Sequence, residues 1–98
     1  MTKGYVLSQE ADNDIEHIFE YGEYKFGTSQ AITYLIGMSA HFDVIAKNPN
    51  IGIERKEIKD ELFSFPYKSH VIFYRKMGGY VRIIRILYGG RDLIKILT

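Results

Sequence analysis

The sequence predicts an α+β domain, in which an N-terminal strand and a helical hairpin precede C-terminal antiparallel strands that form a small sheet packed on the two helices. Three observations predict this class. Two amphipathic segments occupy the first half of the chain, Gly27 and Pro49 interrupt the helical pattern, and residues 63–92 are dense in β-branched and aromatic residues around Gly78-Gly79. We expect residues 1–98 to form a single domain, because a chain this short supports one core.

The charge distribution is strongly asymmetric although the net charge is only +1. Six basic and eleven acidic side chains lie up to Phe63, a net charge of −5, whereas seven basic side chains and one acid follow from Ser64 onward, a net charge of +6. A basic C-terminal half attracts acidic partners or phosphates. The alternative is a solvated surface on which opposite charges pair within the chain.

The composition also indicates which cellular compartment suits the protein. The chain has no cysteine, which excludes disulfides and suits a reducing environment. No apolar signal-peptide core follows the N-terminus, and the longest uncharged run, residues 26–42, contains too many polar side chains to span a membrane. We therefore expect a soluble, cytoplasmic protein.

The N-terminal half should hold a strand and the first helix. The apolar run 5–7 precedes Ser8, a suitable helix N-cap. One face of the following helix, which extends to about Phe26, is formed by Ala11, Ile15, Ile18, Phe19 and Gly22. Gly27 should end this helix, and Thr28 or Ser29 should cap the next.

The second helix carries an apolar seam and ends at Asn48, because the residue before Pro49 is disfavoured in the α conformation. The seam consists of Ala31, Leu35, Met38, Phe42 and Ile45. Further apolar residues broaden it, so the sheet and a second chain could both cover this helix, with core packing as the simpler reading. Residues 50–61 have no clean period and predict a surface loop, with at most a helical turn.

The two runs on either side of Gly78-Gly79 predict a β-hairpin with a two-residue turn. Residue numbers of cross-strand partners then sum to 157. One face carries the pairs Val71 with Ile86, Phe73 with Ile84, Arg75 with Arg82, and Met77 with Tyr80; the other carries His70 with Leu87, Ile72 with Arg85, Tyr74 with Ile83, and Lys76 with Val81.

Both faces of this hairpin are largely apolar. Helices should cover one face, and the C-terminal segment or a partner should cover the other. Arg75 directly opposite Arg82 requires an acidic neighbour, unless both side chains splay into water. The turn that follows the last strand should be a structural corner in which Asp92 caps the next turn and Arg91 pairs locally.

No familiar catalytic arrangement is present. His17, His41 and His70 lack metal-ligand spacing, and the sequence contains neither a P-loop nor a dinucleotide fingerprint. The sequence therefore implies no cofactor, no metal site and no catalytic residues. Its histidines are expected to be exposed or satisfied by hydrogen bonds.

Four segments, in order and spacing, resemble the ParE branch of the RelE/ParE toxin superfamily over nearly the whole chain. They are Tyr5-Val6-Leu7-Ser8 with the acidic helix that follows, Asn48-Pro49-Asn50-Ile51-Gly52, residues 64–75 (SFPYKSHVIFYR) and residues 85–92 (RILYGGRD). One departure is Tyr88, where many ParE-like chains have histidine. The resemblance implies a plasmid-stabilisation type II toxin that inhibits DNA gyrase, causes growth arrest and is neutralised by a ParD-like antitoxin.

The main alternative is a ribosome-dependent mRNA endoribonuclease of the RelE type, which would use basic side chains to activate the 2′-hydroxyl and stabilise the phosphorane. The catalytic positions implied by the superfamily fall near Leu62, Ser64, Val71 and Leu97, and only Arg91 matches. The resemblance therefore favours a non-enzymatic inhibitor that does not bind nucleic acid directly. A degenerate toxin retained as a binding module is a third possibility.

Two surfaces are predicted from the apolar and basic residues. For antitoxin binding we expect Phe19, Ile32, Leu35, Ile36 and Tyr74, as exposed apolar anchors for a disordered tail. For target binding we expect Arg75, Arg82, Arg85 and Arg91, from the C-terminal charge excess. A homodimer within a toxin–antitoxin hetero-oligomer is left open.

Overall fold

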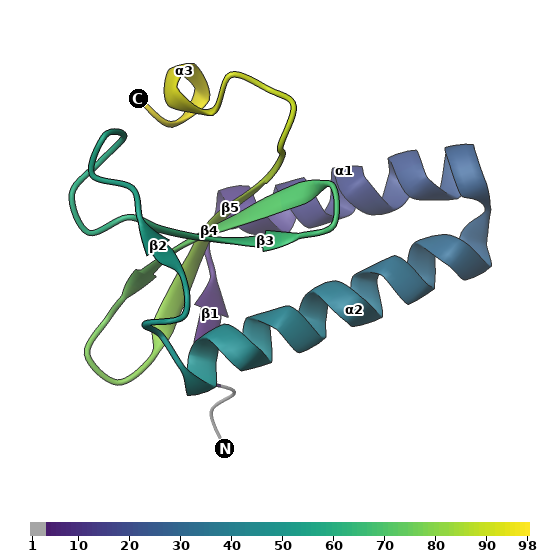
Figure 1. Ribbon diagram of the computed structural model, residues 1–98. Helices are drawn as coiled ribbons and strands as arrows, with labels where there is room; N and C mark the ends of the chain where they lie inside the picture. Colours follow the sequence, from purple (N-terminus) through teal and green to yellow (C-terminus); the bar gives the residue numbers. More distant parts are fainter. Residues whose placement is uncertain (1–3) are drawn as a thin grey trace.

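A five-stranded sheet forms the centre of the computed structural model, which describes residues 4–98 (Figure 1). In chain order the elements are β1 (Tyr5–Leu7), α1 (Gln9–Phe26), α2 (Thr28–Lys47), β2 (Ile53–Glu54), β3 (Phe63–Tyr67), β4 (His70–Lys76), β5 (Val81–Tyr88) and α3 (Leu93–Leu97). The strand order is β1-β5-β4-β3-β2, with β1 parallel to β5 and the other neighbours antiparallel. The predicted α+β class and the order of its elements are confirmed.

The helical hairpin lies on one face of the sheet, and its tip projects beyond the strands (Figure 1). Ser8 is the N-cap of α1 and Asn48 is the C-cap of α2, as predicted. The predicted cap of α2 at Thr28 or Ser29 is wrong. Gly27, with φ +94°, takes that position, and its carbonyl accepts from the Ala31 amide at 3.1 Å. The Thr28 hydroxyl instead donates to Glu23.

The turn of the β4–β5 hairpin is correctly predicted, but half of the register is not. The Met77 amide donates to the Tyr80 carbonyl, and of the two turn glycines only Gly78 has positive φ, as in a type II′ turn. Near the turn the predicted pairs are present: Tyr74 with Ile83, Arg75 with Arg82, and Lys76 with Val81.

A β-bulge between Phe73 and Tyr74 shifts the remaining pairs by one residue, so the predicted pairing there is wrong. The observed partners are His70 with Tyr88, Val71 with Leu87, Ile72 with Ile86, and Phe73 with Arg85, which leaves Ile84 unpaired on β5. An extra residue in one strand increases local twist and redirects side chains. Here the bulge lets Ile83 and Ile86, three residues apart, both enter the helix-facing core.

The region before β4 contains two strands that sequence patterning did not separate. Lys68, at φ +51°, turns the chain so that β3 and β4 form a second hairpin. Within the predicted loop 50–61, residues Ile53 and Glu54 pair with β3 as the edge strand β2. The surface-loop prediction is wrong for those two residues and for Ile58, which is buried.

Two cores lie on opposite faces of the sheet. The first core, between the sheet and the helical hairpin, includes Ala11, Met38, Phe42, Ile45, Tyr67, Ile72, Tyr74, Val81, Ile83 and Ile86. The second core consists of Ile58, Leu62, Phe73 and Leu87, against which Leu93, Ile96 and Leu97 pack. The C-terminal segment therefore covers the second face, as predicted. Asp92 caps α3 by accepting from the Lys95 amide at 3.2 Å.

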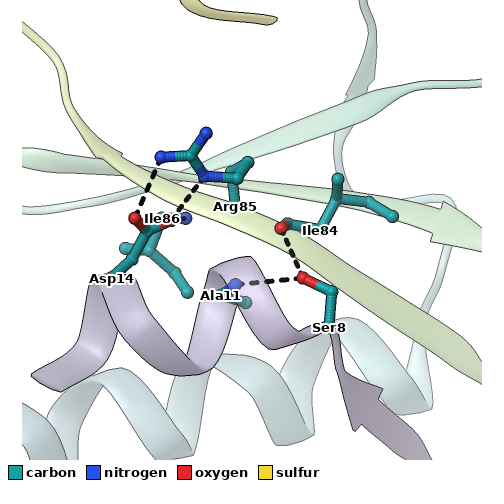
Figure 2. A network of polar contacts seen from close by, with 6 residues as sticks. All are labelled: Ser8, Ala11, Asp14, Ile84, Arg85 and Ile86. Carbon is teal, nitrogen blue, oxygen red and sulfur yellow. Dashed lines mark hydrogen bonds and ion pairs between the residues drawn. The ribbon is translucent and has the colours of Figure 1, made fainter.

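Ser8 joins the end of β1 to β5. Its amide donates to the Ile83 carbonyl at 2.9 Å, and its hydroxyl donates to the Ile84 carbonyl at 2.7 Å. The same oxygen accepts from the Ala11 amide at 3.0 Å, which caps α1 (Figure 2). One buried side chain thus ends a strand, starts a helix and satisfies the bulged part of β5.

Asp14, two turns into α1, holds the next part of the same strand edge. Its carboxylate accepts from the Ile86 amide at 3.0 Å and from the Arg85 guanidinium at 2.8 and 3.0 Å (Figure 2). This bidentate, partly buried ion pair is stronger than a pair on the open surface. α1 is therefore clamped along β5 by polar contacts as well as by the first core.

Neither long helix in residues 4–98 is apolar enough to cross a membrane.

We predict that Asp14→Asn lowers the free energy of unfolding by roughly 1–2 kcal/mol, because the amide oxygen can still accept from Ile86 but the charge that pairs with Arg85 is lost. Urea unfolding at neutral pH measures the change. The matched control is Glu16→Gln, an exposed acid on the same helix, which should shift stability by less than about 0.5 kcal/mol. Equal losses in the two variants would contradict a specific clamp.

Candidate functional site

A cleft of about 650 Å³ opens where α1 diverges from the end of β5. Residues from six segments line it, among them Ile18 and Tyr21 of α1, Tyr34 of α2, Ser69 of the β3–β4 turn, His70 of β4, Ile86 and Tyr88 of β5, and Arg91 of the turn before α3. Most of these side chains are apolar or aromatic with a polar end. Such a lining, with a few fixed polar groups, is typical of a recognition site.

His70 is the best-positioned titratable group in the cleft. Its Nδ1 lies 2.7 Å from the Tyr34 hydroxyl, and its ring meets the edge of the Tyr88 ring at a centroid distance of 6.1 Å. Burial lowers the pKa of His70 from 6.5, and the charge of Asp14 opposes this shift. Burial, followed by the neighbouring Tyr67, raises the pKa of Tyr34. Both groups are thus held neutral near pH 7, as suits hydrogen bonding more than acid–base work.

The other two histidines do not form a cluster with His70. His41 bonds the Gly37 carbonyl through Nδ1 at 2.8 Å, and His17 is exposed on α1 at the cleft. Their hydrogen-bonded or exposed positions agree with the sequence prediction. In residues 4–98 no group of three or more His, Asp or Glu side chains is placed to hold a metal ion.

The positions where an RNA-cleaving relative would carry catalytic side chains are occupied by structural residues. Leu62 belongs to the second core, and Val71 and Leu97 pack against it. Ser64 is buried in β3, and its hydroxyl accepts from Arg55 at 3.2 Å. These side chains hold the sheet together, and they cannot supply the positive charge that phosphoryl transfer requires.

The residues predicted to bind an antitoxin fall into three groups. Ile32 and Ile36 are 47% and 66% exposed on α2. Phe19 and Leu35 are half-buried, and Leu35 packs against the first core. Tyr74 was wrongly predicted to be exposed. It is completely buried in the first core, and its hydroxyl donates to the Pro49 carbonyl and accepts from the Gly52 amide.

Sequence patterning missed three exposed aromatic residues at the end of α1. Tyr21, Tyr24 and Phe26 are exposed, Tyr24 to 87%. Two of them, Tyr21 and Phe26, line the cleft. The available signal was that Tyr21 and Tyr24 lie off the apolar stripe of the first helix, on positions that the helical period turns away from the sheet. Phe26 lies on the stripe, but it is exposed because the end of α1 projects beyond the strands (Figure 1).

The four arginines predicted to bind a target do not form one surface. Arg75 and Arg82 lie opposite each other near the β4–β5 turn, and Glu61 is 4.0 Å from Arg75, which supplies the predicted acidic neighbour. Arg85 is held by Asp14. Arg91 is exposed at the other end of β5, beside the cleft.

Comparisons with known proteins agree on one family. The family described as "ParE toxin of type II toxin-antitoxin system, parDE" matches residues 5–93. Toxin ParE1 of Caulobacter vibrioides is 35% identical over 86 residues, 88% of each chain. Toxin ParE1 of Mycobacterium tuberculosis is 32% identical over 94 residues, 95% of this chain and 96% of that protein.

The fold is also found among solved structures. A structure described as the chromosomal ParDE TA system from P. aeruginosa matches with a TM-score of 0.74 over 89% of this chain and 98% of that chain, at 15% identity.

We predict that the free energy of unfolding decreases as the pH falls below about 6.5, in part through His70. The folded pKa of His70 is lowered by burial, so its protonation favours the unfolded state. The stability is therefore complete above the unfolded pKa and is lost on acidification. Urea unfolding between about pH 7.5 and 5 should show a smaller decrease for His70→Gln than for the parent. His17→Gln, at an exposed histidine, should keep the parent dependence.

Proposed function

This chain belongs to the ParE toxin family of type II toxin–antitoxin systems, and on that premise we propose that it is a protein inhibitor of DNA gyrase that a ParD-like antitoxin neutralises. The observation that carries the non-enzymatic reading is the burial of Leu62 and Ser64, with Val71 and Leu97 packed on the same side of the sheet, where catalysis would need charge. We propose that residues 1–98 act as one toxin domain in the cytoplasm, where gyrase is found.

The basic end of the β4–β5 hairpin is the proposed contact with the target. Arg75 and Arg82 are cross-strand neighbours, Lys76 follows on the same strand, and exposed Met77 and Tyr80 flank the turn. Like charges held side by side destabilise a free sheet, so an acidic partner surface would relieve their repulsion. Arg85 is left out of this surface because Asp14 already pairs with it.

The helical hairpin is the proposed contact with the antitoxin. Ile32 and Ile36 form one exposed apolar strip on α2, and Phe19 and Leu35 are half-buried between the helix surfaces and the core. Exposed apolar residues at helical spacing suit an amphipathic segment that folds on binding. The structural relative's description as a ParDE system supports an antitoxin partner for this chain.

The second candidate function is the ribosome-dependent endoribonuclease. This function is supported by Arg91, which matches a catalytic position of the superfamily. Arg91 and His70 both line the cleft. A binding module that has lost toxicity is the third candidate. In either case the same fold and antitoxin contact would persist.

We predict that the purified protein makes gyrase accumulate linearised DNA in a supercoiling and cleavage assay, and that it leaves ribosome-bound mRNA intact. The double variant Arg75→Glu with Arg82→Glu should raise the concentration needed for half-maximal DNA linearisation at least about ten-fold, since reversed charges repel an acidic target. The control, Lys47→Glu with Lys56→Glu, changes the net charge equally at two exposed sites. Cut mRNA would support the endoribonuclease instead. Full potency of the double arginine variant would exclude this surface from target binding.

We predict that Ile36→Asp weakens antitoxin binding at least about ten-fold, because a charge replaces an apolar anchor in a desolvated contact. Calorimetric titration with the antitoxin measures the affinity. Gln30→Asp, at an exposed position of α2 that the helical period turns away from Ile32 and Ile36, places the same charge outside the apolar strip and should bind as the parent does. Equal affinity of the two variants would exclude the strip from the interface.

A further inference from the structure

The edge of β5 is only partly covered. β1 pairs with Val81, Arg82 and Ile83, and the side chains of Ser8 and Asp14 then reach as far as Ile86. From there α1 continues past the strands (Figure 1). The last residues of β5 therefore have no strand on this side, and the cleft lies beside them.

Hydrogen-bond directions identify which backbone groups face the cleft. The Ile86 amide points away from β4, because it donates to Asp14, and the Gly89 amide points toward the β3–β4 turn, because it donates to the Ser69 carbonyl. Directions alternate along a strand. The amide and carbonyl of Tyr88 therefore point to the same side as those of Ile86, toward the cleft.

Two of these four groups are already used. Asp14 holds the Ile86 amide, and the Arg91 amide donates to the Tyr88 carbonyl at 3.2 Å. The Ile86 carbonyl and the Tyr88 amide remain. A strand residue placed opposite Leu87 lets both groups be satisfied: in a parallel strand its own amide and carbonyl would bond them, and in an antiparallel strand the residues on either side of it would. The free edge can therefore pair with one short extended segment, in line with β1, which pairs with residues 81–83 on the same edge of β5.

The charges at the cleft favour an acidic occupant. Asp14 is the only carboxylate among the lining residues, and Arg85 neutralises it. Arg91 lines the cleft, and the Lys68 ammonium lies 5.7 Å from the centre of the Tyr34 ring. No ion pair within residues 4–98 involves either cation. Ile18 and Tyr34 give the cleft apolar walls that suit an apolar side chain.

We propose that this site binds an extended, acidic segment of the antitoxin, which adds to the sheet as a short strand beside the end of β5 and places an apolar side chain in the cleft. The proposal rests on the proposed function, since its occupant is the antitoxin. It assigns the β5 edge as a second contact, separate from the apolar strip on α2. Main-chain bonds would supply affinity, and Arg91 and Lys68 would select the acidic sequence.

The test compares Tyr88→Pro with Tyr88→Ala. Both variants lose the half-exposed ring, but only proline removes the amide that faces the cleft, and proline is tolerated where a strand amide points away from its neighbour. In calorimetric titrations with the antitoxin, Tyr88→Pro should bind roughly three- to ten-fold more weakly than Tyr88→Ala. Equal affinities of the two folded variants would overturn strand addition.

Amide exchange in the unmodified protein gives a readout that does not depend on the proline variant folding. Saturating antitoxin should slow exchange of the Tyr88 amide at least about ten-fold. Unchanged exchange in the complex would overturn the proposal. Protection that instead grows with toxin concentration, without antitoxin, would assign the edge to a second copy of this chain and overturn it equally.

The requirement for an acidic segment is tested with a matched pair of double variants. Lys68→Glu with Arg91→Glu should weaken antitoxin binding at least about ten-fold at low salt, and more than Lys59→Glu with Lys95→Glu, which reverses two exposed charges away from the lining residues. Equal effects of the two double variants would show that the bound segment need not be acidic. If the parent protein does not bind the antitoxin, the proposed antitoxin function fails and this proposal fails with it; binding that is insensitive to every cleft variant overturns this proposal alone.

Discussion

The attachment of α1 to the edge of β5 is the constraint on which the arrangement of the molecule depends. β1 has only three residues, so the strand edge beyond Ile83 would lie under α1 with unsatisfied backbone groups. Ser8 and Asp14 supply the missing partners at an interval that brings them to one side of the helix. Because Ala11 between them has a small side chain and is fully buried, the helix can approach the strand closely.

The same attachment determines where the protein can bind other molecules. It covers β5 up to Ile86 and leaves the end of the strand beside an apolar cleft. It also engages Arg85, which separates the basic pair near the hairpin turn from Arg91 at the opposite end. On the other face, α3 packs over the second core, and uncharged residues of this core and of β3 occupy the positions where an RNA-cleaving relative would place charge. The resulting surfaces suit recognition of other proteins.

Much of the fold could be predicted because its signals are local. The Ser8 cap, the end of α2 before Pro49 and the turn at Gly78 each follow from the backbone preferences of a few neighbouring residues. The candidate site was predicted less well. Ile32 and Ile36 are exposed as expected, but Tyr74 is a core residue whose hydroxyl binds the chain before β2. Periodicity cannot distinguish an exposed aromatic residue from a buried one whose polar end is satisfied.

The sequence by itself determined the α+β class and the apolar character of both sheet faces, because these depend on composition, order and period. It also identified the family, through the resemblance of four segments to known members. Only the tertiary structure decided which residues of β4 and β5 are cross-strand partners beyond the bulge. One extra residue shifts this register without changing the pattern of residue types. It also decided the role of Arg85 and the opening of the cleft. Both arise from contacts between residues more than 70 positions apart, and charge alone does not identify such partners.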